Sequence, residues 1–503
     1  MSNVIAGKPW IEDRSGDVLN IAWVATDAKP ASRAGRDGRV FQAEEKAEMR
    51  GVLEQMIGSA REVVMISSFL FADANLESAL LNASKRGVRV YLLVASEAKL
   101  EKDVRENDSF SRETLADHKR LLNEFAGWVC MRTAEFFHAK FVLVDPKTQP
   151  RGMLLTANLT KEALTRNHEL GVYLVPNDVR ALASLFVWAF WEAAQHELLE
   201  AGGLPPVVGP EKRMTMPERT GAIVATAGSR RDLRQTVLRL IRSAKRTLVV
   251  STFGIADEEV VQALIERVKE RVAVVLLVRH PRIGMLPILE KLAQAGVSIL
   301  GVSKHLHAKA ILVDGTYGLV MTANLETHGL EDGFEMGVEL AGGDAAALAR
   351  FLETWHAGAL WRLRVNTKIG ELLGSVQVPN GKDYRDLTIE PKGRVNDGIV
   401  NVDSCTRIAA AKAPPASVVP GAKRYHSVEH EWSIELPTLR RSAKPWPLPK
   451  AKDGGSVKVP PFPIFDEPGF GRVFAIEDIS QVEAAKRSMS EYGIGAVVLR
   501  GER

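Results

Sequence analysis

The sequence predicts an α/β protein whose core consists of two similar halves packed together. Short apolar runs alternate along the chain with stretches of helical length, and this alternation is typical of sheets covered by helices on both faces. The same succession of segments and short motifs then occurs a second time. Because a repeated succession of this kind marks a repeated structural unit, we expect each half to form one α/β unit that packs against the other.

Length and composition limit the possible classes. The chain has 503 residues, of which 46% are hydrophobic and 25% charged, with a net charge of +4. These values are typical of a soluble globular protein with roughly two to four domains. A net charge this small permits an anionic partner without requiring one. The two cysteines, Cys130 and Cys405, rule out a disulfide framework and a CxxC zinc site and fit a reducing cytosol.

The sequence gives no sign of export or membrane insertion. The N-terminal residues include acids and no apolar segment of the signal-peptide type. The most apolar helical stretch, at residues 181–191, is far shorter than the roughly 20 residues that a membrane span needs. We therefore expect a cytoplasmic protein with no integral membrane association.

The elements of the two halves follow one order. A helix is expected at residues 43–60 and again at 231–244, and each leads into an apolar strand (VVMISSFLF and TLVVSTFGI). A second helix and a β-branched strand follow (VRVYLLV and VAVVLLV). A further helix, a strand that begins at a histidine, a strand that ends in Thr-Ala-Asn and a last strand (GVYLV and GVEL) complete each half.

The repeat aligns with one insertion. Residues 67–94 align with residues 251–278 at an offset of 184, and Phe, Ala and Asp coincide in both copies. At the histidine strands the offset is 169, so the first half has 15 more residues, in or near the polar segment at 100–120.

Composition marks the boundaries between regions. A linker rich in proline and glycine is expected at 202–221. It separates a first half at 41–201, preceded by an N-terminal extension at 1–40, from a second half at 222–364. The C-terminal region at 365–503 contains APPAS, KPWPLPK and VPPFPIFDEPGFG. We expect this proline-rich extension to be mainly irregular or to contain β-structure.

The repeated strands, HAKFVLVD and HAKAILVD, carry the first candidate site residues. Residues two apart on a strand point to the same face, so each histidine should project together with the following lysine. The aspartate seven residues after each histidine lies at an odd spacing, and we expect it to end the strand and anchor it. These residues are His138, Lys140 and Asp145 in the first half and His307, Lys309 and Asp314 in the second.

Each half also repeats an asparagine and a glutamate downstream. Asn158 precedes Glu169 by eleven residues, and Asn324 precedes Glu335 by the same interval. The interval from histidine to asparagine differs, 20 residues in the first half and 17 in the second. A repeat that served packing alone would have no reason to keep these residue types while its surroundings changed.

The four residue types suit the cleavage of a phosphodiester. A phosphodiester is anionic and repels carboxylate or thiolate nucleophiles, whereas a neutral imidazole can attack phosphorus or donate a proton at neutral pH. Lysine and asparagine supply charge and hydrogen bonds to the non-bridging oxygens. A glutamate on the other ring nitrogen would fix the tautomer and stabilise the imidazolium. Two copies supply two histidines, one to attack and one to protonate the leaving oxygen.

The doubled pattern H-x-K-x4-D with downstream Asn and Glu resembles the phospholipase D superfamily, the HKD phosphodiesterases, over roughly residues 40 to 362. The resemblance implies two α/β halves with mixed sheets flanked by helices, related by pseudo-twofold symmetry, with both motifs lining one cleft. It also implies a covalent phosphohistidine intermediate and no cofactor or metal. The site that it implies consists of His138, Lys140, Asn158, Glu169, His307, Lys309, Asn324 and Glu335, with Asp145 and Asp314 in a structural role.

Two departures from related patterns bear on the substrate. Many members of the superfamily have GSxN where this chain has LTAN and MTAN, so the hydroxyls of Thr156 and Thr322 are candidates for phosphate binding. Because both motifs keep the aspartate, the chain does not match the tyrosyl-DNA phosphodiesterase branch.

Several further residues have two competing interpretations. The basic side chains Lys161, Arg166, Arg279 and Arg282 are candidates for binding a polyanion, and the alternative is that they lie in solvated loops. His305 would share the face of His307, but no acid or cysteine is placed with it, so a metal site is not expected. Tryptophans on the predicted helices, such as Trp191 and Trp355, are expected in the core rather than in a base-stacking platform.

Three functions remain open. The leading one is a metal-independent nuclease acting on DNA or RNA, since a soluble chain of this type has no visible means of reaching lipid. The second is a phospholipid hydrolase or phosphatidyltransferase. The third is a nucleic-acid-binding subunit of a defence or repair complex, kept inactive until a protein partner, such as a separate ATPase or helicase, engages the C-terminal region or the polar insertion. The chain has no P-loop motif of its own.

Overall fold

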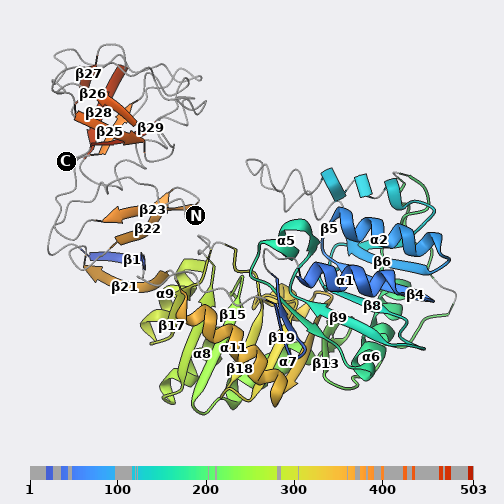
Figure 1. Cartoon of the computed structure of the whole chain (residues 1–503). Coiled ribbons are helices and arrows are strands. Elements are labelled where there is room, and N and C mark those ends of the chain that lie inside the picture. Colours follow the sequence, from blue (N-terminus) through green and yellow to red (C-terminus); the bar gives the residue numbers. More distant parts are fainter. Residues whose placement is uncertain are drawn as a thin grey trace. The chain divides into compact units, whose positions relative to one another are not determined.

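The structure of the protein is a computed structural model, shown in Figure 1, and it divides into two compact units. The larger unit comprises Ala28–His280 and Met285–Leu360, and the smaller unit comprises Met1–Asp27, Pro281–Gly284 and Trp361–Arg503. The residues that the structure describes are 18–25, 35–43, 48–96, 116–118, 120–121, 123–201, 203–209, 212–279, 285–303, 305–359, 361–368, 374–380, 383–389, 398–401, 423–427, 433–436, 464–467, 471–476 and 497–501.

The first half of the larger unit is built on one mixed sheet. Its strands are β2 (Gly35–Asp37), β3 (Val40–Gln42), β4 (Val63–Ser68), β6 (Arg89–Ala95), β7 (Cys130–Ala134), β8 (Phe141–Val144), β9 (Arg151–Leu155), β11 (Leu170–Tyr173) and β12 (His196–Glu197). They lie in the order β12-β7-β6-β4-β8-β9-β11-β3-β2. Strands β4, β6 and β7 run parallel, and the other neighbours are antiparallel.

The helices of the first half are α1 (Glu48–Gly58), α2 (Ala74–Lys85), α5 (Lys161–Thr165) and α6 (Pro176–Trp188), followed by a π-helical turn η1 (Ala189–Ala193). Strands β5 (Phe71–Ala72) and β10 (Leu159–Thr160) pair with each other in a separate short sheet. The long apolar strands are buried on both faces, as expected where helices cover a sheet on both sides.

The second half repeats this plan in its central strands, without a counterpart of the edge strand β12 among its described residues. Its strands are β13 (Ile223–Ala227), β14 (Arg230–Arg231), β15 (Thr247–Thr252), β16 (Ala273–Val278), β17 (Ser298–Gly301), β18 (Ala310–Val313), β19 (Tyr317–Met321) and β20 (Glu335–Ala341). Within this unit they lie in the order β14-β13-β20-β19-β18-β15-β16-β17. Its helices are α7 (Asp232–Ser243), α8 (Glu258–Lys269), α9 (Leu286–Gln294), α10 (Thr327–Glu331) and α11 (Gly343–Ala357).

The matching strand orders confirm the predicted fold class, two similar α/β halves with mixed sheets flanked by helices. The aspartate shared by the aligned segments has a local role in each half. Asp73 accepts the backbone N–H groups of Asn75 and Leu76 at the start of α2, and Asp257 accepts that of Val260 at the start of α8. An N-cap aspartate satisfies donors that the first helical turn leaves unpaired, so the same residue starts the same helix twice.

The sheet of the first half begins earlier than expected. Strand β2 starts at Gly35, among the residues that the sequence analysis assigned to the N-terminal extension. The hairpin of β2 and β3 precedes α1 as the hairpin of β13 and β14 precedes α7. The turn sequences differ, GRDGRVFQ against IVATAGSRR, so sequence comparison does not align them.

The two halves share one hydrophobic core. A single cluster of buried side chains includes Phe137 and Phe186 of the first half and Leu306, Phe334 and Trp355 of the second. The rings of Phe137 and Phe334 meet edge to face with centroids 5.4 Å apart. The halves are therefore one packed body, since burying this apolar surface is the dominant favourable term.

The expectation for Trp191 was wrong, whereas that for Trp355 is confirmed. Trp355 is fully buried, but Trp191 is 44% exposed. Helix α6 continues into the π-helical turn η1, which changes the direction of the side chains that follow Trp188. The ring of Trp191 instead covers the guanidinium of Arg132, 4.4 Å from the ring centroid.

The smaller unit contains only β-strands among its described residues. Strands β21 (Trp361–Lys368), β1 (Val18–Ala25), β22 (Gly374–Asn380) and β23 (Asp383–Ile389) pair antiparallel in that order. A six-stranded sheet contains β24 (Gly398–Asn401), β25 (Lys423–Ser427), β26 (Ser433–Leu436), β27 (Ile464–Glu467), β28 (Gly471–Ile476) and β29 (Val497–Gly501). The proline-rich segments KPWPLPK and APPAS, and most of the polar insertion at 100–120, lie outside the described residues.

Among the helices that the structure describes, each is too short or too polar to cross a lipid bilayer.

An aspartate ends each histidine strand and anchors it to the neighbouring strand. Asp145 follows β8 with a left-handed φ of 47°, and Asp314 follows β18 with a φ of 50°. Aspartate is one of the few residues that adopts this conformation at low cost. The Asp145 carboxylate accepts the N–H groups of Arg61, Glu62 and Val63 at 2.8 to 2.9 Å, and that of Asp314 accepts those of Lys245, Arg246 and Thr247 at 2.8 to 3.1 Å.

We predict that Asp145→Ala lowers the free energy of unfolding by roughly 2 to 4 kcal/mol, since N–H donors lose their acceptor and alanine must hold a left-handed φ. Burial raises the pKa of Asp145, but the three N–H donors lower it more. The stabilisation is therefore present above the unfolded pKa, about 3.9, and is lost as the pH falls through the folded pKa. Urea denaturation at neutral and acidic pH measures both effects.

Asp314→Ala is the matched control. Its hydrogen bonds are exposed to solvent, whereas Asp145 is fully buried. Water can replace the lost acceptor at Asp314, so the loss of stability should be clearly smaller there. Equal losses in the two variants would contradict this account.

Candidate active site

Two histidine–glutamate pairs cross between the halves. The Nδ1 atom of His138 lies 2.6 Å from Oε1 of Glu335, and Nδ1 of His307 lies 2.6 Å from Oε1 of Glu169. Each histidine thus meets the glutamate of the opposite half. The glutamates are buried, whereas the histidine side chains remain 28% and 19% exposed. The exposed edge of each ring is available to a ligand.

Backbone bridges between the halves bring these pairs together. The carbonyl of His168 accepts the N–H groups of His307 and Ala308, and the N–H of His168 donates to His305. At the pseudo-equivalent place, the N–H of His138 donates to Phe334, whose own N–H donates to Phe136. The residue before each glutamate is therefore bonded to the segment that carries the opposite histidine, which fixes the distance between carboxylate and imidazole.

This bridging explains one difference from the sequence analysis. The strands were expected to begin at the histidines, but β8 begins at Phe141 and β18 at Ala310. The backbone at each histidine bonds to the other half rather than to its own sheet. The lysine still projects toward the histidine two residues earlier, as expected.

Lys140 and Lys309 lie against the two imidazoles and are fully buried. The Nζ atom of Lys140 lies 2.9 Å from Nδ1 of His138, and that of Lys309 lies 3.0 Å from Nδ1 and 2.9 Å from Nε2 of His307. Each ammonium also donates to the carbonyl of its own histidine. The lysines thus place positive charge beside both rings.

Burial sets the protonation of these groups. Burial lowers the pKa of His307 to about 4, with Glu169 opposing and Lys309 adding to the shift. Burial also lowers the pKa of His138, opposed by Glu335. Burial lowers the pKa of Lys140 to about 7, although the carboxylate of Glu335 opposes this. Both imidazoles are therefore neutral at pH 7 in the free protein.

The glutamates are ionised. Burial raises the pKa of Glu169, but the His307 ring, Lys309 and Thr156 together lower it below its usual range. The same balance, with His138, holds the pKa of Glu335 low. Since an ionised carboxylate only accepts hydrogen bonds, each imidazole carries its proton on Nδ1 and has an unprotonated lone pair on Nε2. In His307 this lone pair faces the Nζ atom of Lys309, 2.9 Å away.

The threonines lie behind the glutamates. The hydroxyl of Thr156 donates to Oε2 of Glu169 at 2.5 Å and accepts the N–H of Leu170. That of Thr322 donates to Oε2 of Glu335 and accepts the N–H of Met336. Both side chains are fully buried. The sequence analysis made them candidates for phosphate binding, but their hydroxyls are already used to hold the glutamates.

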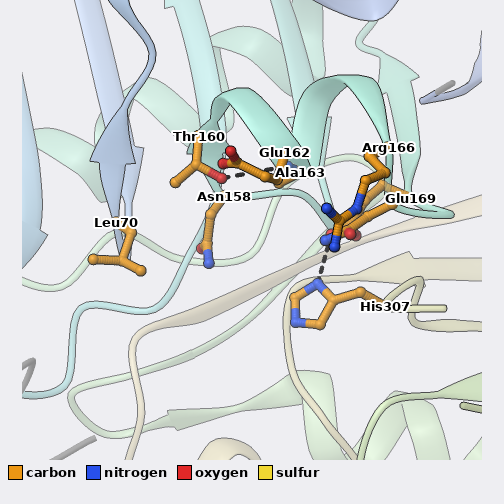
Figure 2. A pocket seen from close by; sticks show the side chains of 9 residues that line it. Leu70, Asn158, Thr160, Glu162, Ala163, Arg166, Glu169 and His307 are labelled. Atoms are coloured by element: carbon orange, nitrogen blue, oxygen red, sulfur yellow. Dashed lines mark hydrogen bonds and ion pairs between the residues drawn. The ribbon is translucent and has the colours of Figure 1, made fainter. Parts of the chain in front are cut away.

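A pocket opens beside His307, as Figure 2 shows. Asn158 faces it, and its Oδ1 is buried without a hydrogen-bond partner among the described residues; the same is true of Oδ1 of Asn324. An amide oxygen only accepts hydrogen bonds, so a ligand group that donates a hydrogen bond would complete each of these atoms. The lining residues are Leu70, Asn158, Thr160, Glu162, Ala163, Arg166, Asn167, Glu169 and His307.

The basic candidates separate into distinct positions. Arg166 lines the pocket, whereas Lys161 is exposed on α5 and does not. The guanidinium of Arg279 lies 4.8 Å from the ring centroid of Phe253. Arg282 lies outside the described residues. Within the described part of the chain, no group of three His, Cys, Asp or Glu side chains could hold a metal ion.

Two phenylalanines were missed by the sequence analysis as part of the site. The ring of Phe69 meets that of His138 edge to face with centroids 5.0 Å apart, and Phe253 meets His307 at 4.7 Å. Both occupy the same position of the repeat, just after β4 and β15. Their coincidence in the two aligned segments was the available signal.

Comparison with known families adds to this geometry. The family model described as "Cardiolipin synthase, PLD-like domain" matches residues 53–189 and 237–355, one segment in each half and together just over half of the chain. No protein in a search of curated sequences matches the chain.

Three solved structures resemble parts of the chain. Phosphatidylserine synthase from Haemophilus influenzae Rd KW20 shares 12% identity with a TM-score of 0.44, over 67% of this chain and 88% of that one. Nuc from Salmonella typhimurium, a phospholipase D family member, shares 19% identity with a TM-score of 0.25, over 28% of this chain and 96% of that one. Polyphosphate kinase from Porphyromonas gingivalis shares 13% identity with a TM-score of 0.42, over 63% of this chain, which spans 49% of the kinase.

We predict that Glu169→Gln lowers the pKa of His307 further, because the carboxylate is the group that raises it against burial. Nitrogen-15 NMR of histidine-labelled protein measures both this pKa and the tautomer, with His307→Ala assigning the signal. Glu162→Gln is the matched control, since this pocket carboxylate makes no contact with the ring. A pKa of His307 that is unchanged or raised in Glu169→Gln would contradict the electrostatic account.

Proposed function

The chain belongs to the PLD-like domain family of phosphodiesterases, and we propose that its reaction is metal-independent cleavage of nucleic acid, DNA or RNA, through a covalent phosphohistidine. The observation that carries this proposal is the crossed arrangement of two Glu–His pairs beside a polar pocket. Each histidine has an unprotonated Nε2, a carboxylate behind Nδ1 and a lysine at its side, and in His307 that lysine also lies 2.9 Å from Nε2.

The geometry supports a two-step displacement. In the first step, Nε2 of one histidine attacks phosphorus and forms a P–N bond as the P–O bond to the leaving group breaks. The other histidine, protonated when the anionic substrate binds, gives its proton to the leaving oxygen. In the second step the now neutral histidine takes a proton from water, whose oxygen attacks phosphorus and displaces the first histidine. The second histidine thereby regains its proton, and the phosphoryl group leaves on the oxygen of the water, so the enzyme is regenerated.

The remaining residues have matching roles in this proposal. Lys140 and Lys309 stabilise the charge on the non-bridging oxygens, and the amides of Asn158 and Asn324 donate hydrogen bonds to them. Glu169 and Glu335 orient the imidazoles and stabilise the imidazolium, as a triad aspartate does. Asp145 and Asp314 hold the histidine segments in place.

The pocket lining favours a nucleic-acid backbone. Most of its side chains are polar, and the guanidinium of Arg166 adds a group that binds phosphate. A lipid substrate would bring two acyl chains that need apolar surface. The second candidate, a phospholipid hydrolase or phosphatidyltransferase, is favoured by the description of the matching family model, which names cardiolipin synthase.

One assay separates these candidates. We predict that the protein cleaves plasmid, linear DNA, single strands or RNA in excess EDTA and releases no headgroup from phospholipid vesicles offered in parallel. His138→Ala and His307→Ala should each lower the rate at least about a hundredfold, as expected for a lost general acid or nucleophile. His356→Ala, on the exposed end of α11, is the matched control and should retain full activity.

Two outcomes would overturn the proposal. Cleavage that requires added magnesium would exclude the metal-independent mechanism. Release of headgroup from vesicles without any cleavage of nucleic acid would establish the lipid alternative.

The low pKa of Lys140 predicts a pH dependence. The lysine must be charged to bind phosphate, and about 7 is its pKa in the free protein. Protonation is complete below this pKa and is lost as the pH rises through it, so kcat/KM should fall above about pH 7. The bound phosphate favours the ammonium, so the corresponding limb in kcat should lie at higher pH. A kcat/KM that is constant from about pH 6 to about pH 9 would contradict this role.

A further inference from the structure

The crossed site is symmetric at its centre and asymmetric at its flanks. We propose that Glu326 closes the second-half flank to phosphate, so that the protein binds the anionic chain of its substrate on one side of the scissile phosphate only. This inference rests on the proposed function, because it specifies how a nucleic-acid strand lies in the site.

The asymmetry is visible where the two halves are compared position by position. The segment from Ala157 to Glu169 reads ANLTKEALTRNHE, and its counterpart at 323–335 reads ANLETHGLEDGFE. Both have the same length and keep the asparagine and glutamate of the site. Between these two residues the first segment carries Lys161, Glu162 and Arg166, whereas the second carries Glu326, Glu331 and Asp332. One flank is therefore basic overall and the other purely acidic, apart from a histidine.

On the first-half flank the space beside the asparagine is open. The hydroxyl of Thr160 turns away to accept the N–H of Ala163 and cap α5. This leaves the pocket between Leu70, Asn158 and His307, with Arg166 at the far end, as Figure 2 shows. Glu162 also lines this pocket, but Arg166 offsets its charge. A phosphate that follows the scissile one can lie here.

On the second-half flank a carboxylate fills the equivalent place. Glu326 replaces Thr160, and it does not cap α10 with its side chain. Gly254 replaces Leu70, and a Cβ built on Gly254 would lie 2.2 Å from Oε1 of Glu326. Nδ2 of Asn324 points at Oε2 of the same carboxylate, 3.4 Å away. Because Gly254 has no side chain, the carboxylate of Glu326 occupies the space that a leucine would need at this position.

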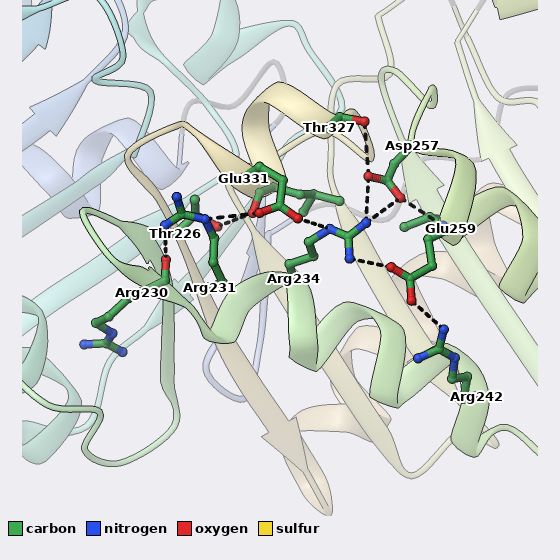
Figure 3. A network of polar contacts seen from close by, with 11 residues as sticks. Thr226, Arg230, Arg231, Arg234, Arg242, Asp257, Glu259, Thr327 and Glu331 are labelled. Carbon is green, nitrogen blue, oxygen red and sulfur yellow. Dashed lines mark hydrogen bonds and ion pairs between the residues drawn. The ribbon is translucent and has the colours of Figure 1, made fainter.

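The segment that carries Glu326 is held by a network of ion pairs, shown in Figure 3. Glu331 pairs with Arg231 at 3.2 Å and with Arg234 at 2.6 Å, so α10 is tied to α7. Arg234 also pairs with Asp257, which accepts the hydroxyl of Thr327, the residue after Glu326. These arginines pair with Glu331, whereas the carboxylate of Glu326 lies beside the site residue Asn324 and against Gly254.

Arg279 is a further basic residue of the second half, and it lies near the ring of His307 rather than on α10. Its guanidinium lies over the ring of Phe253, and Phe253 contacts His307. Its charge therefore acts at the centre of the site, where the scissile phosphate binds, rather than at the flank. A flanking phosphate on the second-half side would still approach the carboxylate of Glu326, and like charges at this range repel.

The consequence is a directional substrate. A strand that continues as phosphates on both sides of the cleaved bond meets one favourable and one unfavourable flank. A strand with its charge on one side only avoids the carboxylate. We therefore expect preference for a bond near a strand end, with a fixed polarity.

Dinucleotides test this directly. Thymidylyl-thymidine and its uridine counterpart contain one phosphodiester, and a terminal phosphate can be added at the 5′ end or at the 3′ end. Each compound is measured for its own kcat/KM and for its inhibition constant against cleavage of a longer DNA or RNA strand. In the wild type, one terminal phosphate should improve binding over the other by at least about fivefold, from repulsion between unit charges in partly screened surroundings.

Removing the charge should abolish the difference. Glu326→Gln keeps the shape, and Glu326→Thr restores the residue that caps α5 in the first half, so at least one of them should fold. In both variants the inhibition constants of the two terminally phosphorylated dinucleotides should lie within about twofold of each other, because the disfavoured compound binds more tightly. Glu258→Gln removes an equal charge from the exposed start of α8 and should leave the wild-type ratio unchanged.

The outcomes separate this inference from the proposed function. The inference is wrong if the wild type cleaves nucleic acid but binds the two terminally phosphorylated dinucleotides equally well, or if the ratio of their inhibition constants persists in both Glu326 variants. In either case the proposed nuclease function is unaffected. If the wild type cleaves no nucleic acid at all, the proposed function fails and takes the inference with it.

Discussion

The exchange of glutamates between the halves is the constraint on which the rest of the site depends. Neither half completes its own histidine: the carboxylate behind His138 comes from Glu335, and that behind His307 comes from Glu169. The site therefore exists only when the halves are docked. The shared core, with Phe137 against Phe334, holds them in the register that this exchange requires. A buried carboxylate without its partner would be strongly destabilising, so docking and site formation are coupled.

The balance of charges in the buried site explains how it can be stable without substrate and still bind an anion. With both imidazoles neutral, two ammonium groups balance two carboxylates when Lys140, whose pKa is about 7, is protonated. A bound phosphodiester adds one negative charge, and the uptake of one proton by an imidazole restores the balance. That proton is the one the leaving oxygen needs. The low pKa values of the free histidines therefore do not oppose catalysis, because the substrate itself raises the proton affinity of the site.

Much of this arrangement could be predicted from the sequence because it depends on short, repeated spacings. The apolar runs predicted the strands, and the repeat of His, Lys, Asn and Glu predicted which residues belong together. The crossing of the glutamates could not be predicted, since the spacing from Asn158 to Glu169 is the same whether the carboxylate serves its own half or the other. The role of Thr156 was also out of reach, because a hydroxyl that holds a buried glutamate and one that binds a phosphate leave the same letter in the sequence. The π-helical turn that exposes Trp191 has no spacing signature at all.

The distribution of differences between the halves follows from the same physics. A two-step displacement needs two equivalent histidines, so the residues that touch both rings are kept in both copies. The flanking segment from asparagine to glutamate has no such requirement, because a substrate strand has a direction and a twofold axis does not. Any residue there that favours one orientation of the strand must break the symmetry of the repeat. The pair Leu70 and Thr160 of the first half is replaced by Gly254 and Glu326 in the second. The smaller residue at one position makes room for the larger one at the other, so the packing around the catalytic centre is preserved while the charge of one flank changes.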